Sequence, residues 1–337
     1  MKIGNLDFDG YVFGQSGVQG TFGEPDEYPI HKLLRFFPGF SFIGMIFVAK
    51  TVTLYERIFP ESSNTELVDG YKLKKWFPKS IWIRPGSFLK GFMLNAMGIP
   101  NPGLRVILRY KKWQVREDAF QISIALMGKN PKEKVIEAGR ICTLLLRYLP
   151  PGKYKYALQI NDSCPNLGHN QEQDSLSLIR VLKIFKKRLP GLTIILKFDL
   201  RVNPLTIVEL TPYCDAFCIG NSLPFGKLMP PEWWLKLFPR GSPLLKYFGG
   251  KFAGGLSGKP LFPILVDWLT EMEKVDDSVI IIAGGGIMEK KNIRRLSQFK
   301  IVHAIALGCV ATLRPWRLQS LIAYGNKVFR EKTLKFA

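Results

Sequence analysis

The stretch Val279-Ile-Ile-Ile-Ala-Gly-Gly-Gly-Ile-Met288 shows the pattern that decides the fold. An apolar run typical of a buried strand ends in a glycine cluster, and an amphipathic stretch at 289–298 follows it. The same order of apolar run and helical pattern recurs along the chain, so that eight segments are predicted to be strands. They lie at 11–14, 43–50, 121–126, 156–161, 192–198, 215–219, 279–283 and 301–307.

Amphipathic stretches long enough for crossover helices lie between these strands, at 131–147, 173–187, 259–274 and 289–298. Eight strands joined by helical crossovers predict an α/β fold, the (β/α)8 TIM barrel, whose functional residues lie on loops at the C-terminal strand ends. A chain of 337 residues suits one such barrel. We therefore expect a single domain over 1–337.

Two insertions near 71–100 and 223–253 interrupt the pattern. Residues 76–100 are predicted to form a hairpin, and 223–251 to form a long loop rich in Pro, Trp, Phe and Lys. Segments that mix aromatic and basic residues suit a membrane interface or a partner subunit, and they suit equally a lid packed over its own barrel.

Composition indicates an ordinary globular protein with an unusual charge. No window reaches the ~18 apolar residues of a membrane span, and the N-terminal residues lack the pattern of a secretory signal. Five cysteines with no Cys-x-x-Cys pair fit the cytoplasm. The net charge of +21 suits a nucleic acid, an anionic lipid surface, a small anionic substrate, or simply a solvated basic surface.

Polar and glycine residues stand where the barrel would place a ligand. The glycines at 284–286 and Gly308 follow the last two predicted strands, where barrels commonly bind phosphate. Lys50 and Lys197 end apolar runs, and an ammonium group at the barrel mouth requires an anionic neighbour. That neighbour is an anionic ligand or an ordinary Asp or Glu side chain.

The segment Gln159-Ile-Asn-Asp-Ser-Cys-Pro-Asn-Leu-Gly-His169 raises three hypotheses for Cys164. A catalytic zinc needs three protein ligands, and a chain with three histidines in all makes a metal site at Cys164 and His169 a poor match. No nucleophile elbow surrounds any serine. What remains is a thiol acting as a base between the amides of Asn161 and Asn166, with no role assigned to His169.

The order of these motifs resembles dihydroorotate dehydrogenase over nearly the whole chain. The motifs that carry the resemblance are Phe13-Gly-Gln-Ser-Gly17, Val48-Ala-Lys-Thr51, Leu94-Asn-Ala-Met-Gly-Ile-Pro-Asn-Pro-Gly103, Asn-x-Ser-Cys-Pro-Asn at 161–166, Leu-Lys at 196–197, Asn-Ser at 221–222, Gly-Gly-Leu-Ser-Gly-Lys-Pro at 254–260, Ile-Ile-x-Gly-Gly-Gly-Ile at 281–287 and Leu-Gly-Cys at 307–309. Ordered agreement of this kind is far more specific than any single motif.

The resemblance implies an FMN-binding barrel that oxidises dihydroorotate to orotate in pyrimidine (UMP) biosynthesis. Cys164 would remove the C5 proton while the C6 hydride passes to flavin N5. Members with cysteine here are class 1 enzymes, whereas the membrane-associated class 2 enzymes use serine. Substrate contacts are implied for Lys50, Asn95, Gly98, Ile99, Asn161, Asn166, Asn221 and Ser222. FMN contacts are implied for Ser16, Gly17, Lys50, Thr51, Asn161, Lys197, Gly255, Gly285, Gly286, Gly308 and Cys309.

Some residues depart from the family pattern. Family members usually have Thr where Cys309 stands, and Gly17 competes with Gly20 for one role in the first FMN loop. The run at 255–260 also resembles class 2, although the N-terminal helical extension of class 2 is not seen. The electron acceptor therefore stays open among fumarate, NAD through a partner subunit, and a quinone reached by the aromatic and basic segments. We expect a homodimer, with an electron-transfer subunit or a peripheral membrane contact as further partners.

Two other function classes are alternatives to the dihydroorotate dehydrogenase hypothesis. An RNA-modifying flavoenzyme of the tRNA-dihydrouridine synthase type shares the barrel and a cysteine loop, and the net charge of +21 favours it. No helical RNA-binding domain follows the barrel, however, and the amide set is complete, so a nucleic-acid partner is not expected. Intact Cys164, Lys50 and Lys197 disfavour a noncatalytic scaffold.

Overall fold

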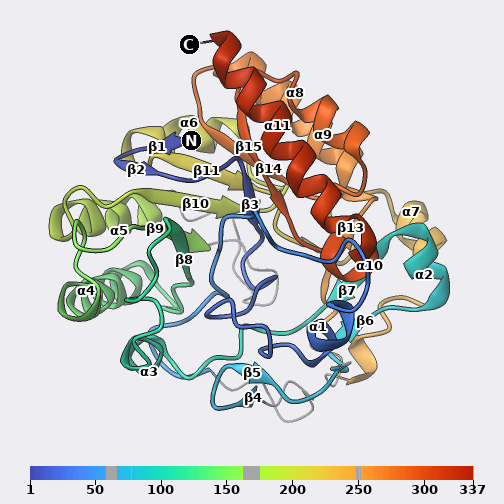
Figure 1. The fold of residues 1–337 in the computed structure, drawn as a ribbon, viewed down its shortest axis with the longest axis horizontal. Coiled ribbons are helices and arrows are strands. Elements are labelled where there is room, and N and C mark those ends of the chain that lie inside the picture. The colour runs from blue at the N-terminus through green and yellow to red at the C-terminus, as the bar shows by residue number, and fades with distance from the viewer. Residues whose placement is uncertain (58–66, 77, 162–174, 248–249, 251, 337) are drawn as a thin grey trace.

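Seven short apolar segments pair in parallel to form the central sheet (Figure 1). The computed structural model describes residues 1–57, 67–76, 78–161, 175–247, 250 and 252–336. The strand order is β3-β15-β14-β11-β10-β9-β8. Their bounds are β3 Val12–Gly14, β8 Phe120–Ile124, β9 Tyr156–Asn161, β10 Ile194–Phe198, β11 Ala216–Ile219, β14 Ile281–Gly284 and β15 Val302–Leu307. All seven predicted positions are confirmed within about two residues at each end.

The segment 46–52 closes the ring between the two edge strands. Its backbone pairs with β3 through Ile46 and Val12, whose N–H···O distance is 2.8 Å, and with β8 through Ala49 and Gln121 at 2.9 Å. Single parallel bridges, rather than a regular ladder, join this segment to its neighbours. The predicted strand at 43–50 is thus irregular and displaced toward the C-terminus, but the predicted eight-membered barrel is confirmed.

Helices cover the outside of the barrel. Their bounds are α1 Pro29–Leu34, α2 Pro85–Lys90, α3 Leu104–Arg109, α4 Pro131–Tyr148, α5 Ser175–Arg188, α6 Pro204–Leu210, α7 Pro231–Leu237, α8 Leu261–Val275, α9 Lys290–Leu296, α10 Val310–Leu313 and α11 Leu318–Phe336. Helix α4 begins where the Asn130 side chain accepts the Glu133 N–H at 2.9 Å, with Pro131 at the first position. The predicted helices at 131–147, 173–187 and 259–274 are confirmed, and the one at 289–298 is shorter than predicted.

The two insertions form one antiparallel sheet of order β12-β13-β7-β6. Its strands are β6 Ile81–Trp82, β7 Phe92–Asn95, β12 Leu223–Pro224 and β13 Gly255–Gly258. The predicted hairpin over 76–100 is confirmed, since β6 and β7 pair antiparallel with α2 between them, and β13 pairs with the other edge of β7. Hydrogen bonding between the two insertions, not a tight turn, determines this sheet.

Aromatic side chains from both insertions pack on one another beside this sheet. The ring of Phe238 lies 5.5 Å from Trp82 and 5.6 Å from Phe92 between centroids. Phe225 and Trp234 lie 4.7 Å apart, and Trp234 and Phe238 are buried. Burial of these rings favours the lid interpretation over an exposed membrane contact at 233–240.

Short N-terminal strands close the other end of the barrel. β1 Lys2–Ile3 and β2 Leu6–Asp7 form a hairpin, and Ile3 and Phe8 join an inner apolar cluster with Phe13. A further pair, β4 Leu67–Val68 and β5 Lys72–Leu73, lies beside α3 at the lower edge in Figure 1. The barrel is therefore plugged by apolar residues at one end, which leaves the C-terminal strand ends for the site.

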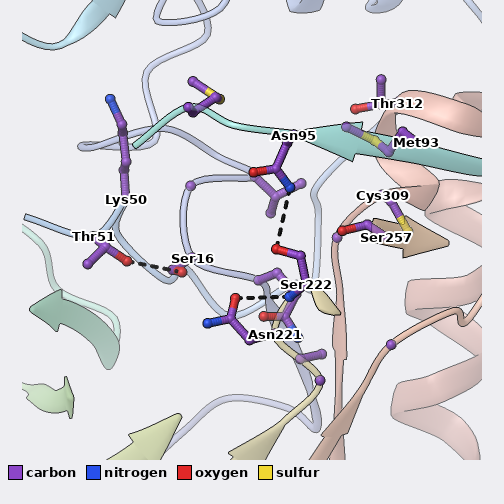
Figure 2. A pocket seen from close by; sticks show the side chains of 18 of the residues that line it. Ser16, Lys50, Thr51, Met93, Asn95, Asn221, Ser222, Ser257, Cys309 and Thr312 are labelled. Atoms are coloured by element: carbon purple, nitrogen blue, oxygen red, sulfur yellow. Dashed lines mark hydrogen bonds between the residues drawn. The ribbon is translucent and has the colours of Figure 1, made fainter. Parts of the chain in front are cut away.

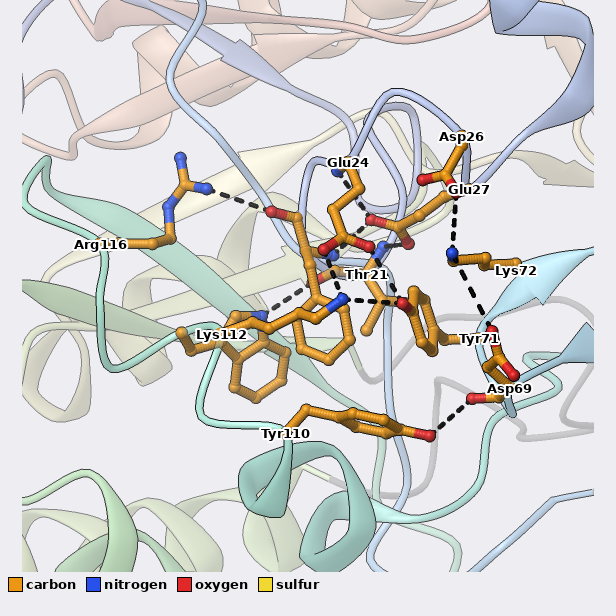
Figure 3. Close-up of polar contacts among 12 residues, drawn as sticks. Thr21, Glu24, Asp26, Glu27, Asp69, Tyr71, Lys72, Tyr110, Lys112 and Arg116 are labelled. Carbon is orange, nitrogen blue, oxygen red and sulfur yellow. Dashed lines mark hydrogen bonds and ion pairs between the residues drawn. The ribbon is translucent and has the colours of Figure 1, made fainter.

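A buried carboxylate holds the loop that follows β3. Glu27 is fully buried and accepts backbone N–H groups from Thr21, from Phe22 at 2.7 Å and from Glu24 at 3.0 Å (Figure 3). Burial raises the pKa of Glu27, and the three N–H donors oppose that shift. Nearby, Lys112 pairs with Glu24 and also donates to the Tyr71 hydroxyl at 2.8 Å. The loop is thereby fixed to the barrel wall.

Replacing Glu27 with Ala should destabilise the protein by about 3 kcal/mol, because three backbone N–H groups, two of them in buried hydrogen bonds, lose their acceptor. Urea unfolding followed by circular dichroism measures the difference. Asp26→Ala is the matched control, since its ion pair with Lys72 is at the surface, where solvent screens it and it contributes little to stability. Equal effects of the two substitutions would contradict the anchoring role of Glu27.

Candidate functional site

A cavity of about 260 Å³ opens at the C-terminal ends of the barrel strands, under the antiparallel sheet. The structure brings nearly all the predicted site residues to its wall. Those that line it are Ser16, Gly17, Lys50, Thr51, Asn95, Gly98, Ile99, Asn161, Lys197, Asn221, Ser222, Gly285, Gly286, Gly308 and Cys309. Gly255 lies in β13 but does not line the cavity. Cys164, Asn166 and His169 lie outside the described residues.

Polar side chains from several strand ends form one hydrogen-bonded network along the cavity wall. Asn221 Nδ2 donates to Asn161 Oδ1 at 2.9 Å, and Asn161 Nδ2 donates to Thr51 Oγ1 at 3.0 Å. Asn95 lies on β7 of the antiparallel sheet, and its Nδ2 is 3.4 Å from the Oγ of Ser222, which follows barrel strand β11 (Figure 2). The network holds three amide groups and two hydroxyls in fixed positions.

The barrel register explains why Asn161 and Lys197 meet. The two residues are Cα partners in the β9 and β10 ladder, so both side chains point into the barrel at the same height. Lys197 is 3% exposed, and its Nζ donates to Ser16 Oγ at 2.9 Å. The Lys197 ammonium group is therefore held at the cavity wall beside the loop that follows β3.

Lys50 supplies a second ammonium group. Its side chain is 7% exposed, and Nζ donates to the carbonyl oxygen of Pro100 at 2.7 Å. Burial lowers the pKa of Lys50 to about 8, and the charge of Glu27 opposes that shift. No Asp or Glu lines the cavity among the described residues. The cavity is therefore electropositive and suits an anionic ligand.

The far end of the cavity is built from glycines and small polar residues. Gly286 has a φ of +74°, and a β-carbon there would lie 2.7 Å from Phe262 N and 2.8 Å from Gly258 O. Only glycine fits this close approach of two backbone segments. Ligand atoms at this end would meet backbone groups and not side chains, as a phosphate requires.

Several residues that line the cavity were not predicted from the sequence, among them the polar Gln15, Tyr28, Ser257 and Thr312. Thr312 lies three residues after Cys309, near the start of α10, so a hydroxyl is available close to the thiol. Burial raises the pKa of Cys309 to about 12, which keeps the thiol neutral. Cysteine in place of the family's usual threonine at position 309 thus adds no negative charge to the glycine-lined end of the cavity. The spacing of one helical turn was the feature that could have identified Thr312.

Comparisons with known proteins agree with this geometry. No family model matches the chain. A protein of Pediococcus pentosaceus named as a dihydroorotate dehydrogenase A (fumarate) is 26% identical over 210 residues, which cover 58% of this chain and 60% of that protein. The dihydroorotate dehydrogenase B (NAD(+)) catalytic subunit of Exiguobacterium sibiricum is 25% identical over 236 residues, covering 68% and 69%. This chain is similar to dihydroorotate dehydrogenases.

The similarity predicted from the motifs is confirmed, although the match spans less than two thirds of the length of the Pediococcus protein. Among solved structures, that of dihydroorotate dehydrogenase (DHODH) from Eimeria tenella in complex with ferulenol has a TM-score of 0.63 at 17% identity. The alignment covers 96% of this chain and 82% of that one. This structural likeness supports the barrel fold.

The part of the chain that the structure describes contains no helix long and apolar enough to cross a bilayer. The same residues contain no group of three or more His, Cys, Asp or Glu side chains that could hold a metal ion.

Replacing Gly286 with Ala should destabilise the protein by about 2 kcal/mol or more, because the methyl group would meet two backbone segments at a positive φ. Gly86→Ala in α2 is the control, since nothing lies within 4 Å of a β-carbon there and its φ is ordinary. Urea unfolding compares the two variants, and a neutral Gly286→Ala would contradict the close approach.

Proposed function

We propose that this protein is a flavin-dependent dihydroorotate dehydrogenase, which oxidises dihydroorotate to orotate in pyrimidine (UMP) biosynthesis. The observation that carries the proposal is the electropositive cavity, in which Lys50, Lys197, Asn95, Asn161, Asn221 and Ser222 meet. The sequence similarity to dihydroorotate dehydrogenases A and B supports it. We treat residues 1–337 as one FMN-binding domain.

The residues on the cavity wall fit FMN. The glycine end offers a cradle without side chains, Thr312 offers a hydroxyl, and Lys197 offers a positive charge. Ser16, Gly17 and Thr51 line the cavity on the β3 side, between these two features. In our proposal Gly285, Gly286, Gly308 and Cys309 hold the phosphate and Lys197 faces the flavin's N1/O2 edge, with Gly255 behind the cavity wall. Bound FMN would supply the acceptor for a hydride, which carries the two electrons of the oxidation.

The amides and hydroxyl would bind the substrate. A pyrimidine ring with a carboxylate presents carbonyl oxygens, N–H groups and a negative charge, and amide side chains match both donors and acceptors. Asn95, Asn161, Asn221 and Ser222 would hold these groups with Asn166, while Lys50 offsets the carboxylate charge. Gly98 and Ile99 line the cavity beside Pro100, to which the Lys50 ammonium is bound.

Cys164 would act as the general base that takes the C5 proton of dihydroorotate. It follows Asn161 by three residues in the sequence, and Asn161 is fixed at the cavity wall. A thiol with an ordinary pKa near ~8.5 needs only modest stabilisation of its thiolate to serve as a base. Two buried ammonium groups in the same cavity offer that stabilisation.

The assembly and location of the protein belong to the same proposal. We infer a homodimer in the cytoplasm, with peripheral membrane contact or an electron-transfer subunit as the route to the oxidant. The name of the Exiguobacterium relative, a catalytic subunit, supports a partner subunit. Fumarate, NAD and a quinone remain the candidate acceptors, and assays with each one on the isolated chain separate them.

Purified protein loaded with FMN should lose its flavin absorbance near ~450 nm when dihydroorotate is added without oxygen. Transfer RNA with NADPH is the comparison, because a dihydrouridine synthase would respond to that pair instead. Bleaching by tRNA and NADPH but not by dihydroorotate would contradict the proposal.

Cys164→Ala should slow bleaching by dihydroorotate by ~10²-fold or more while FMN stays bound, as expected when a general base is lost. Stopped-flow absorbance measures the rate, and Cys142→Ala is the control, since that cysteine is buried in the helical layer away from the cavity. An unchanged rate in Cys164→Ala would mean that another group takes the proton.

Orotate should bind less tightly as the pH rises through about 8, because the Lys50 ammonium loses its proton there. The ammonium is present below this pKa, so affinity is highest on the acidic side. Titration of the flavin spectrum with orotate at several pH values gives the profile. Lys50→Gln should weaken binding at neutral pH and flatten the profile, and an unchanged slope in this variant would contradict the role of Lys50.

A further inference from the structure

Large apolar side chains are exposed together on one side of the molecule, outside the cavity. Phe36 is 85% exposed, Ile43 is 78% exposed and Leu89 is 76% exposed. Leu33, Phe37 and Trp316 are exposed as well. We call these six residues, with the cations around them, the apolar-basic patch.

Hydrogen bonds and a ring contact join the three segments that carry this patch. A hydrogen bond of 3.0 Å runs from Gln319 N to Gly39 O, and Gln319 Nε2 lies 3.3 Å from Ile43 O. The ring of Trp316 lies 6.2 Å from that of Phe88. Helices α1, α2 and α10 accordingly lie near one another on one side of the barrel (Figure 1). Three segments far apart in the sequence therefore lie side by side where these apolar residues are exposed.

Basic residues surround these apolar side chains. Lys32, Arg35 and Lys90 are exposed. Arg314 donates to the carbonyl oxygens of Phe88 at 2.6 Å and Leu89 at 2.7 Å, and its guanidinium lies 5.7 Å from the Trp316 ring centroid. Two carboxylates lie at the margin of the patch, since Asp26 interacts with Lys32 and Glu289 pairs with Arg317 at 3.5 Å. The sequence has no Asp or Glu at 28–55 or 290–330, so basic residues outnumber acidic ones on the patch segments.

We propose that the apolar-basic patch binds the surface of an anionic phospholipid bilayer. Exposed aromatic and aliphatic side chains beside Lys and Arg are what an interfacial membrane contact requires, since the rings enter the headgroup region while the cations meet lipid phosphates. The patch is distinct from the aromatic residues of the lid, whose rings are largely buried against each other. The inference does not rest on the proposed enzymatic function.

Charge favours the lipid over a second copy of this chain. A symmetric contact through the patch would bring two surfaces of the same positive charge together, and like charges at an interface repel. An anionic bilayer neutralises the same cations. The patch also begins one helix from the cavity: Tyr28 precedes α1 and donates to Gly17 O at 2.6 Å. A bound membrane would therefore lie near the β3 side of the cavity.

Sedimentation of the full FMN-loaded chain with vesicles tests this proposal. Vesicles of equimolar phosphatidylcholine and phosphatidylglycerol should carry the protein into the pellet, and vesicles of phosphatidylcholine alone should not. Added salt should release it, because the contribution of each cation is screened. Protein that stays in the supernatant with anionic vesicles, or binds both kinds equally, overturns the proposal.

Substitutions in the apolar-basic patch test whether its residues make the contact with the bilayer. Phe36→Ser with Ile43→Ser should lower the partition coefficient of the protein between vesicles and water at least tenfold. That is roughly the effect expected when two apolar side chains that enter the bilayer are lost. Lys32→Gln with Arg35→Gln should lower it about tenfold at low salt. Leu205→Ser is the matched control, because Leu205 is 60% exposed on α6, away from the patch in Figure 1.

An equal loss in Leu205→Ser would overturn the assignment of the patch. Sedimentation velocity of each variant without lipid tests the alternative partner of the patch, a second copy of the chain. If Phe36→Ser with Ile43→Ser converts a dimer into a monomer, the patch is a contact between copies of the chain and the proposal is wrong. Circular dichroism verifies folding, and the salt dependence of the unaltered protein keeps the test valid if a variant fails to fold.

Discussion

The parallel register of the barrel strands is the constraint on which the rest of the structure depends. Pairing of Lys197 with Asn161 across β9 and β10 places an ammonium group and an amide at one height inside the barrel. The chain after β11 is tied to the same edge, because the N–H groups of Gly220 and Asn221 both donate to Phe198 O at 3.1 Å. A slip of one residue in any of these strands would turn the polar side chains outward.

Segments far from the strands complete the cavity. The loop after β3 is held at the site because the Glu27 carboxylate accepts hydrogen bonds from its backbone N–H groups. The antiparallel sheet brings Asn95 and Ser257 over the barrel mouth. No Asp or Glu lines the cavity wall in the described ranges, where Lys50 and Lys197 both lie. Such a site has its charge compensated when an anionic ligand binds, which is why the geometry suits a flavin phosphate and a carboxylate.

The strands and the crossover helices could be predicted because each is a clear apolar run or an amphipathic repeat. The lid could not, since Gly255-Leu-Ser-Gly258 has neither alternation nor β-branched residues and becomes a strand only through its partners in β7 and β12. The segment 46–52 paired through single bridges, so its bounds were displaced. The residues chosen from motif order mostly line one cavity, whereas Thr312 was not among them although its spacing of one helical turn from Cys309 could have indicated it.

A crystal structure of the protein grown with FMN and orotate tests the central claim most directly. We expect the flavin phosphate at Gly286 and Gly308 and the isoalloxazine edge beside Lys197. We expect orotate to be held by Asn95, Asn161 and Asn221, with its carboxylate near Lys50. Density for orotate outside this cavity, or a flavin phosphate away from the glycine end, would contradict it.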